Sequence, residues 1–169
     1  LELEFKMKLL PNWVWQPNLA LSSNQNLDFI FERDGELVDL GKTQLAYSPN
    51  LISGSSLTYA ASTNFQITLL SKFVGKQYMG NIDSENSILP SYFINDLNIS
   101  YVWRPNKLLK EIQFSFLINN LLNKQYESNG YFYTYNDTWS APGKITTIEG
   151  AGFYPQAGIN FLTGLMIKF

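Results

Sequence analysis

The sequence predicts an all-β fold, a transmembrane antiparallel β-barrel. Three observations support this prediction. Apolar and polar residues alternate with a period of two in segment after segment, the charged fraction is low for a soluble protein, and the connections between the alternating segments are short and long in turn. Together these features are typical of outer-membrane barrels.

Composition favours an apolar environment that is crossed by strands rather than by helices. Aromatic residues make up 15% of the chain and charged residues another 15%, whereas a soluble domain is about a quarter charged. The mean hydropathy is −0.12. No stretch approaches the roughly 18 consecutive apolar residues of a membrane helix. Strands with one polar face explain this near-neutral average.

The first two predicted strands lie at residues 1–10 and 13–22. In the first, apolar residues at odd positions alternate with Glu2, Glu4, Lys6 and Lys8. The second carries Trp13, Trp15, Leu19 and Leu21 on one face. Pro17 interrupts it, and because proline cannot donate a hydrogen bond to a neighbouring strand, we expect a bulge there.

Five further strands follow the same pattern. Those at 65–78, 93–103, 112–119 and 159–169 alternate clearly, and the one at 47–59 is weaker. The links near 10–12, 60–64 and 104–111 are short, with turn residues such as Pro105, Asn106 and Lys107. The links near 24–46, 79–91 and 126–155 are long and polar. This sorting predicts periplasmic turns at one end and extracellular loops at the other.

Aromatic residues cluster next to the short turns, on the apolar parity. We expect Trp13, Trp15, Tyr101 and Trp103 to form an interfacial girdle at the membrane boundary. The alternative is the core of a soluble sandwich. The girdle is favoured because the opposite parity suits a water-filled lumen, with polar residues at Glu2, Glu4, Lys6, Lys8, Gln66, Asp96, Asn98, Gln113, Ser115 and Lys168.

Seven strands cannot close an antiparallel barrel, and open edges are not tolerated in lipid. We therefore expect the remaining strands to come from elsewhere, most simply from an N-terminal part of the same protein. Leu1 already lies inside a strand pattern and no signal peptide is visible, so the chain is expected to begin within a longer protein.

Several function classes find no support. Cysteine and histidine are absent, which removes thiolate chemistry and the commonest metal ligands, and no cofactor or metal is expected. The net charge of −2 argues against nucleic-acid binding. Glu2 and Glu4 form a carboxylate pair about 7 Å apart on one strand face. Because Lys6 and Lys8 continue the row, a polar wall explains the pair better than an enzyme does.

Four segments resemble a known family. Residues 154–169 (YPQAGINFLTGLMIKF) and 119–126 (NNLLNKQY) resemble the end of TonB-dependent receptors, especially those of Bacteroidota. Residues 48–52 (SPNLI) and 72–81 (KFVGKQYMGN) resemble earlier segments of that family, in the expected order. The resemblance covers most of residues 45–169, and it implies that residues 1–169 are the C-terminal portion of the barrel.

The resemblance implies a barrel of roughly 22 strands, plugged by an N-terminal domain, in the outer membrane of a Gram-negative bacterium. Such receptors import a scarce nutrient, such as an iron chelate, cobalamin, a glycan or a peptide. Energy comes from the proton-motive force through the inner-membrane TonB complex, which pulls on the plug. The implied partners are lipid, the plug, the TonB complex and a surface lipoprotein.

Two sets of site residues follow. Aromatic and amide or carboxylate side chains in the last long loop suit ligand contact, namely Tyr131, Phe132, Tyr133, Tyr135, Asn136, Asp137 and Trp139. Packing of this loop on its neighbours is the alternative. The terminal pattern Phe161, Leu165, Ile167 and Phe169 resembles the family's barrel-assembly signal. The alternative functions are a passive porin, a structural barrel subunit of an envelope complex, and a soluble carbohydrate-binding sandwich.

Overall fold

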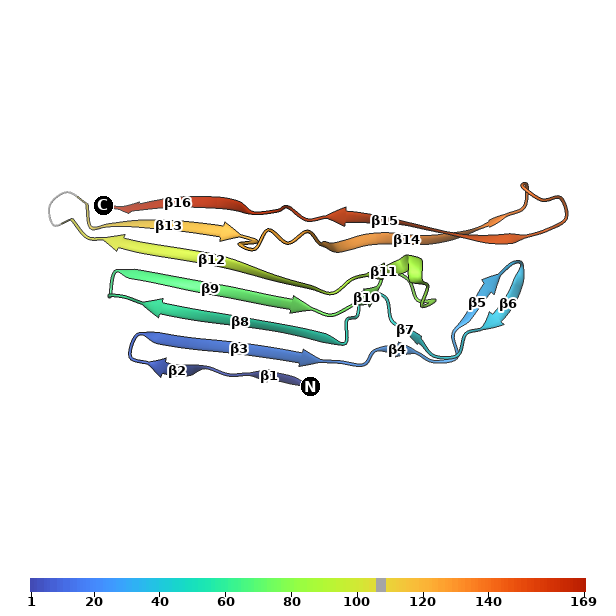
Figure 1. Ribbon diagram of the computed structural model, residues 1–169, viewed down its shortest axis with the longest axis horizontal. Helices are drawn as coiled ribbons and strands as arrows, with labels where there is room; N and C mark the ends of the chain where they lie inside the picture. The colour runs from blue at the N-terminus through green and yellow to red at the C-terminus, as the bar shows by residue number, and fades with distance from the viewer. Residues whose placement is uncertain (106–108) are drawn as a thin grey trace.

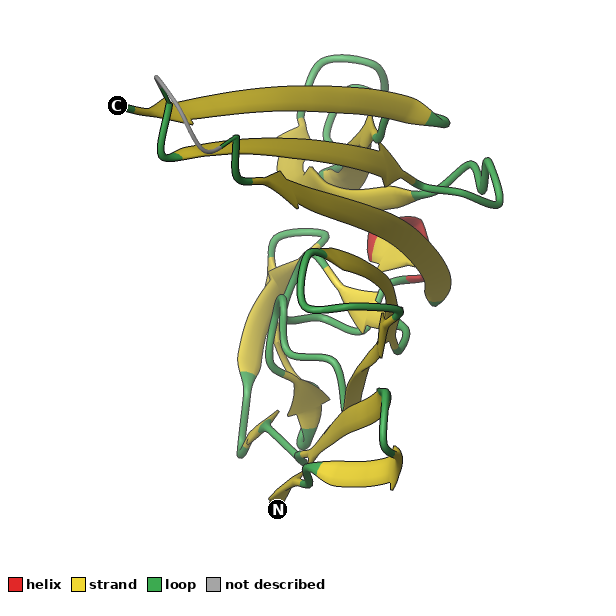
Figure 2. Cartoon of the chain, turned by 90° about the vertical axis from the view of Figure 1, so that its left-hand side faces the viewer, coloured by secondary structure: helices red, strands yellow, loops and turns green. Residues whose placement is uncertain are grey.

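Alternating strands pair with their sequence neighbours in a computed structural model of the chain, which describes residues 1–105 and 109–169. Eight strands form one antiparallel sheet in the order β1-β3-β8-β9-β12-β13-β16, and β2 also pairs with β3. Figure 1 shows this meander, and Figure 2 shows its curvature from the end that carries the short turns. The strands are β1 (Glu2–Glu4), β2 (Met7–Leu10), β3 (Trp13–Leu21), β8 (Leu51–Ala60), β9 (Phe65–Val74), β12 (Tyr92–Trp103), β13 (Glu111–Asn119) and β16 (Asn160–Lys168).

The long connections contain small sheets of their own, and all of them lie at the other end of the meander (Figure 1). Each is an antiparallel pair, and the last is as long as a wall strand. The pairs are β4 (Gln25–Asn26) with β7 (Thr43–Gln44), β5 (Ile30–Arg33) with β6 (Glu36–Asp39), β10 (Gln77–Tyr78) with β11 (Ile88–Leu89), and β14 (Glu127–Asp137) with β15 (Thr146–Pro155). A short 3-10 helix, η1 (Glu85–Ser87), precedes β11.

The register places the two predicted parities on opposite faces of the sheet. One cross-strand row is wholly apolar and runs from β3 to β16 through Trp15, Leu57, Leu69, Leu97, Ile118 and Phe161. The row beside it holds the Thr58–Thr68 hydroxyl pair and Asn98. Because a slip of one residue would exchange the faces, this pairing confirms the predicted strand parities.

The apolar face has no second protein layer over it within the described residues. Phe93, Tyr101, Phe114, Phe161 and Leu165 are 44–65% exposed. A sandwich would bury these side chains under a facing sheet. The soluble-sandwich alternative is therefore wrong, and the exposed face is the one that a barrel turns to lipid.

Pro17 does not produce the expected bulge in its own strand. β3 is continuous, and Pro17 pairs in register with Ser55 of β8. The interruption falls on the opposite neighbour, where β1 and β2 are separated by Phe5 and Lys6. Phe5 donates its N–H to the Pro17 carbonyl at 3.0 Å, but Pro17 has no N–H to return. The missing donor thus breaks the edge strand instead of bending β3.

Two strand limits were wrong. The strand predicted at 47–59 begins at Leu51, because Tyr47 has a φ of 54° and donates its N–H to the Tyr78 carbonyl instead of to the sheet. The strand predicted at 65–78 ends at Val74, and Gln77–Tyr78 turns away to pair with β11. Both segments leave the wall to build the loop end.

Of the turn predicted at Pro105-Asn106-Lys107, the last two residues lie outside the described part. Among the described residues, no helix has the length and apolar character needed to cross a membrane.

Candidate ligand-binding site in the long loops

The last long connection is a twisted two-stranded ribbon rather than an irregular loop. Tyr131, Tyr133 and Tyr135 alternate along one face of β14, with neighbouring ring centroids 6.2 and 6.4 Å apart and ring planes within 20° of parallel. Trp139 continues the row 6.0 Å beyond Tyr135, and Tyr154 of β15 joins its other end, 6.0 Å from Tyr131. These five rings, named here the aromatic ladder, are 43–70% exposed.

Two glycines set how these rings lie. Gly152 and Gly150 are the cross-strand partners of Tyr131 and Tyr133. A Cβ atom at either glycine would collide with the facing tyrosine ring, so the rings lie across the ribbon on bare backbone. An aromatic ring over a cross-strand glycine compensates for the packing that glycine cannot supply. The two glycines therefore leave the space that the rings of Tyr131 and Tyr133 occupy on this face of the ribbon.

A turn stabilised by Asp137 positions the end of the ladder. Asp137 Oδ1 accepts the backbone N–H of Trp139 at 3.0 Å and that of Ser140 at 3.1 Å. Hydrogen bonds from the Ser140 side chain and from these two N–H groups lower the pKa of the Asp137 carboxyl. The ionised carboxylate therefore holds the turn that stacks Trp139 on Tyr135, with their planes 5° from parallel.

The other face of the ribbon packs on the loop between β10 and β11. Phe132 lies against Gly80, where a Cβ atom would meet its ring. Tyr47 donates its hydroxyl to the Gly130 carbonyl at 2.9 Å, and Met79, which is 5% exposed, lies against Gly130. Phe132 was predicted as a ligand contact, but it serves this packing face.

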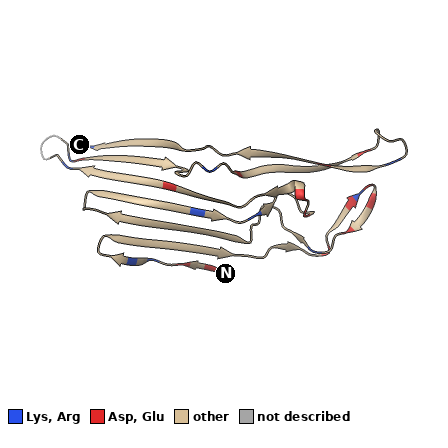
Figure 3. Cartoon of the chain, viewed as in Figure 1, with Lys and Arg blue, Asp and Glu red and all other residues tan. Residues whose placement is uncertain are grey.

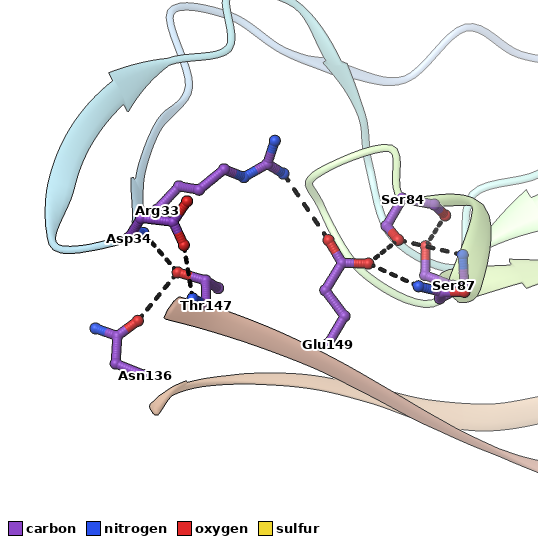
Figure 4. Close-up of polar contacts among 8 residues, drawn as sticks. Arg33, Asp34, Ser84, Ser87, Asn136, Thr147 and Glu149 are labelled. Atoms are coloured by element: carbon purple, nitrogen blue, oxygen red, sulfur yellow. Dashed lines mark hydrogen bonds and ion pairs between the residues drawn. The ribbon is translucent and has the colours of Figure 1, made fainter. Parts of the chain in front are cut away.

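Side-chain hydrogen bonds join the tip of the β5–β6 hairpin to β15 (Figure 4). Asp34 and Thr147 exchange two bonds of 2.7 Å. The Asp34 N–H donates to Thr147 Oγ1, and the Thr147 N–H donates to Asp34 Oδ1. Asn136 extends this contact, since it accepts from Thr147 Oγ1 at 3.1 Å and donates to Glu32 Oε1 at 2.7 Å. Residues 113 positions apart in sequence are thereby tied together.

Glu149 joins a third segment to the same ribbon (Figure 4). Its Oε2 accepts from the Ser84 hydroxyl and from Asn86 Nδ2, the latter at 3.0 Å. Its Oε1 lies 3.8 Å from the Arg33 guanidinium. We call the Asp34–Thr147, Glu32–Asn136 and Glu149 contacts the loop clasp. The clasp holds all three long connections in one assembly.

A buried hydrogen-bond network around Asn120 connects the loop assembly to the wall. Asn120 is 4% exposed and has a φ of 50°. Its N–H donates to Asp96 Oδ1 at 2.7 Å, and its side-chain amide donates to the carbonyls of Lys124 and Ala157. Its Oδ1 accepts the Lys124 N–H at 2.9 Å. This one residue therefore connects β12, the end of β13 and the segment that leads into β16.

Apart from Phe132, the predicted ligand-contact residues divide into two groups. Tyr131, Tyr133, Tyr135 and Trp139 lie together on the exposed ladder, whereas Asn136 and Asp137 are engaged in internal hydrogen bonds. The sequence reasoning missed the ladder's fifth ring and the clasp. The glycines at 150 and 152, spaced two apart like the tyrosines that they face, are the signal in the sequence that would have predicted a paired strand.

Solved structures of three receptors and transporters are similar to the chain over both the wall and the loops. The siderophore receptor PiuA of Acinetobacter baumannii matches 98% of the chain with a TM-score of 0.61 and 16% identity. The ferric yersiniabactin uptake receptor FyuA of Yersinia pestis also matches 98%, with a TM-score of 0.57 and 17% identity. The chain has the fold of a receptor barrel. It spans 21% and 23% of those two chains, about a fifth of their length.

A third structure, the ferric citrate transporter FecA in its unliganded form, matches 90% of the chain with a TM-score of 0.50 and 13% identity. No family model and no curated protein sequence matches the chain. At the level of the fold, the three receptor barrels agree with the resemblance to TonB-dependent receptors that the sequence motifs carry. The neighbours are transport receptors rather than enzymes.

In this receptor-barrel fold, most of the other predicted residues lie on the wall strands. Trp13 stacks on Tyr59 at 4.7 Å beside one short turn, and Tyr101 and Trp103 lie at the turn end of β12. Phe161, Leu165 and Ile167 share the exposed face of the edge strand β16, and Phe169 directly follows it. The register puts the predicted lumenal residues on the opposite face, except Lys6, which falls in the gap between β1 and β2.

Proposed function

We propose that this chain is the C-terminal part of the barrel of a TonB-dependent receptor in the outer membrane of a Gram-negative bacterium, and that the receptor imports a scarce nutrient. One observation carries the proposal. An exposed platform of five aromatic rings stands at the long-loop end of a transmembrane wall, and contacts between the loops hold it in place. A passive pore has no need of such a platform.

The aromatic ladder is the proposed ligand contact. Flat rings offer a large apolar area at a small cost in side-chain entropy, and they suit the planar or cyclic parts of an iron chelate, cobalamin, a glycan or a peptide side chain. The loop clasp supports this role because it positions the ladder before a ligand arrives. A binding surface that is already ordered loses less free energy on binding than one that must be ordered.

The remaining surfaces have roles in the same proposal. Trp13, Trp15, Tyr101 and Trp103 form the inner interfacial girdle against outer-membrane lipid. The polar face lines the lumen, next to a plug supplied by the N-terminal remainder of the protein. The plug couples to the inner-membrane TonB complex, and a surface lipoprotein covers the loops. Phe161, Leu165, Ile167 and Phe169 form the barrel-assembly signal.

Energised uptake tests the proposal. Cells that express the full-length receptor, with wild-type or altered chain, are given labelled ferric citrate, ferric yersiniabactin, cobalamin, an oligosaccharide and a peptide in turn. We expect at least one compound to accumulate above its external concentration and to stop accumulating when an uncoupler removes the proton-motive force. Uptake that only equilibrates and ignores the uncoupler would favour the porin, and no uptake of any of them would favour the structural subunit.

Replacing the three ladder tyrosines 131, 133 and 135 by alanine should lower the affinity for that compound at least tenfold, since each aromatic contact contributes about 0.5–1.5 kcal/mol. The matched control is Tyr59→Ala, which removes one stacked tyrosine at the opposite end of the wall. Equal affinities for the triple variant and the wild type would contradict ligand contact by the ladder.

The assembly signal has a separate test. Deleting Phe169, which is 77% exposed, should lower the amount of folded receptor in the outer membrane more than it lowers synthesis. Pulse labelling followed by heat-modifiable migration of membrane extracts measures both quantities. Equal membrane levels of the deletion and the wild type would remove Phe169 from the signal.

A further inference from the structure

A small polar pocket lies on the lumenal face, where the wall meets the loop assembly. It is an open pocket of about 220 Å³ between the first half of β12, the end of β13 and the start of β16. Its polar lining comes from five side chains in addition to Asn120, namely Asp96, Asn119, Tyr126, Gln156 and Asn160. Tyr154 is the ring that β15 contributes to the aromatic ladder, and Gln156 follows it by two residues. The pocket therefore lies close to the ladder along the chain.

The printed side-chain contacts of the pocket leave two of its oxygen atoms free to accept a hydrogen bond from a ligand. Asn119 Nδ2 donates to Asn160 Oδ1 at 2.9 Å, and Asn160 Nδ2 donates to the Gly158 carbonyl at 2.9 Å. Asp96 Oδ1 accepts the Asn120 N–H at 2.7 Å. Within the described part of the chain, neither Asp96 Oδ2 nor Asn119 Oδ1 accepts a hydrogen bond. A carboxylate oxygen and an amide oxygen that are both free in one pocket can accept hydrogen bonds from a cationic donor group.

Tyr126 adds to this character without adding a charge. Burial raises the pKa of its phenol, and the nearby Asp96 carboxylate raises it further. The hydroxyl therefore stays neutral at pH 7, and it can accept a hydrogen bond from a ligand. Its ring stacks on Tyr92 with centroids 4.4 Å apart, which fixes its position beside the pocket.

The long connections around the pocket carry a net negative charge, which favours a cationic ligand. Segments 22–50, 75–91 and 120–159 hold ten Asp and Glu residues against five Lys and Arg, a net charge of −5. The rest of the chain holds four acidic and seven basic residues, a net charge of +3. Figure 3 shows acidic residues gathered at the loop end. A field of this sign raises the local concentration of cations and disfavours anions at the mouth of the barrel.

We propose that this pocket, with the Asp96 carboxylate in its lining, binds a cationic donor group of the ligand, either a primary ammonium or a guanidinium. The pocket thereby selects the charge of the ligand group that it binds. This inference rests on the proposed import function only for the transport of the ligand after it has bound. Binding in the pocket itself needs no energy source.

The test uses the full-length receptor in detergent micelles and agmatine as the probe, since agmatine carries a guanidinium at one end and an ammonium at the other. Isothermal titration should give saturable binding to the wild type. Asp96→Asn should weaken that binding about tenfold or more, because charge-assisted hydrogen bonds are lost. The substitution keeps an acceptor for the Asn120 N–H, so heat-modifiable migration should be unchanged and should show that the barrel is intact.

Two controls isolate the pocket and the charge. Glu2→Gln removes a carboxylate from the same lumenal face, opposite Ala20, and should bind agmatine like the wild type. Butyramide and butyrate, which are neutral and anionic, should not bind measurably.

The proposal is overturned if agmatine does not saturate the wild type, as expected if a basic side chain of the receptor's own plug fills the pocket. It is also overturned if Asp96→Asn binds agmatine as tightly as the wild type. Either result leaves the energised-uptake experiment unaffected.

Discussion

The wall sheet and the loop assembly are built from the same kind of strand but are held together differently. In the wall, regular backbone ladders join sequence neighbours, and the side chains sort into two faces. In the loop assembly, side-chain hydrogen bonds join segments up to 113 residues apart, and several backbone positions have positive φ. The wall can therefore tolerate many side chains of the right polarity, whereas the loops depend on particular ones.

The largest expected effect is on the apolar face of the wall. Leu97→Arg should destabilise the folded barrel by up to about 4 kcal/mol, because it places a charge against lipid. Asn98→Arg, one residue away on the lumenal face, should cost far less. Urea unfolding of the full-length receptor in lipid vesicles measures both. Equal losses of stability for the two variants would contradict the assignment of the faces.

The next effect is at the junction of the two regions. Asn120→Ala should lower the free energy of unfolding by roughly 2–4 kcal/mol, because the partners of its buried amide lose their hydrogen bonds and alanine disfavours a φ of 50°. Asn120→Gly accepts that φ and should recover part of the loss. If Asn120→Gly and Asn120→Ala have equal free energies of unfolding, the positive φ of Asn120 makes no contribution to the stability of this hydrogen-bond network.

A smaller and more local effect is expected in the loop clasp. Thr147→Val keeps the shape of the side chain but removes the acceptor for the Asp34 N–H, so about 1–2 kcal/mol should be lost locally. Hydrogen exchange should quicken at residues 30–39 and not in the wall strands. Thr58→Val, which breaks the hydroxyl pair with Thr68 in the wall, is the control and should leave the loops protected.

The smallest effect depends on pH. The pKa of Asp137 is lower in the folded chain than its ordinary value near 3.8, so its contribution to stability is present above that value and is lost as the pH falls through the folded pKa. The fluorescence of Trp139, with Trp13, Trp15 and Trp103 replaced by phenylalanine, should change below about pH 4 as the turn opens. Asp137→Asn should abolish the change, and a change that persists would assign it to another group.

Much of the wall was predictable from the sequence because strand parity is a local property. The faces of 65–74, 93–103 and 112–119 follow from alternation alone, and the predicted lumenal residues other than Lys6 fall on the predicted face. The loop assembly was not predictable in the same way. The bond between Asp34 and Thr147 joins distant segments, and no local pattern specifies it. Pro17 shows an intermediate case, since its missing N–H was recognised but its effect appears on the neighbouring strand.

The central claim is that the wall spans the membrane with the loop assembly outside and the short turns inside. The chain has no cysteine, so single cysteines can be introduced at Trp139, in the ladder, and at Ser62, in the turn between β8 and β9, of a full-length receptor without other cysteines. A membrane-impermeant maleimide added to intact cells should label position 139 and not 62, and should label both after the outer membrane is permeabilised. Labelling of position 62 in intact cells, or protection of 139, would contradict the claim.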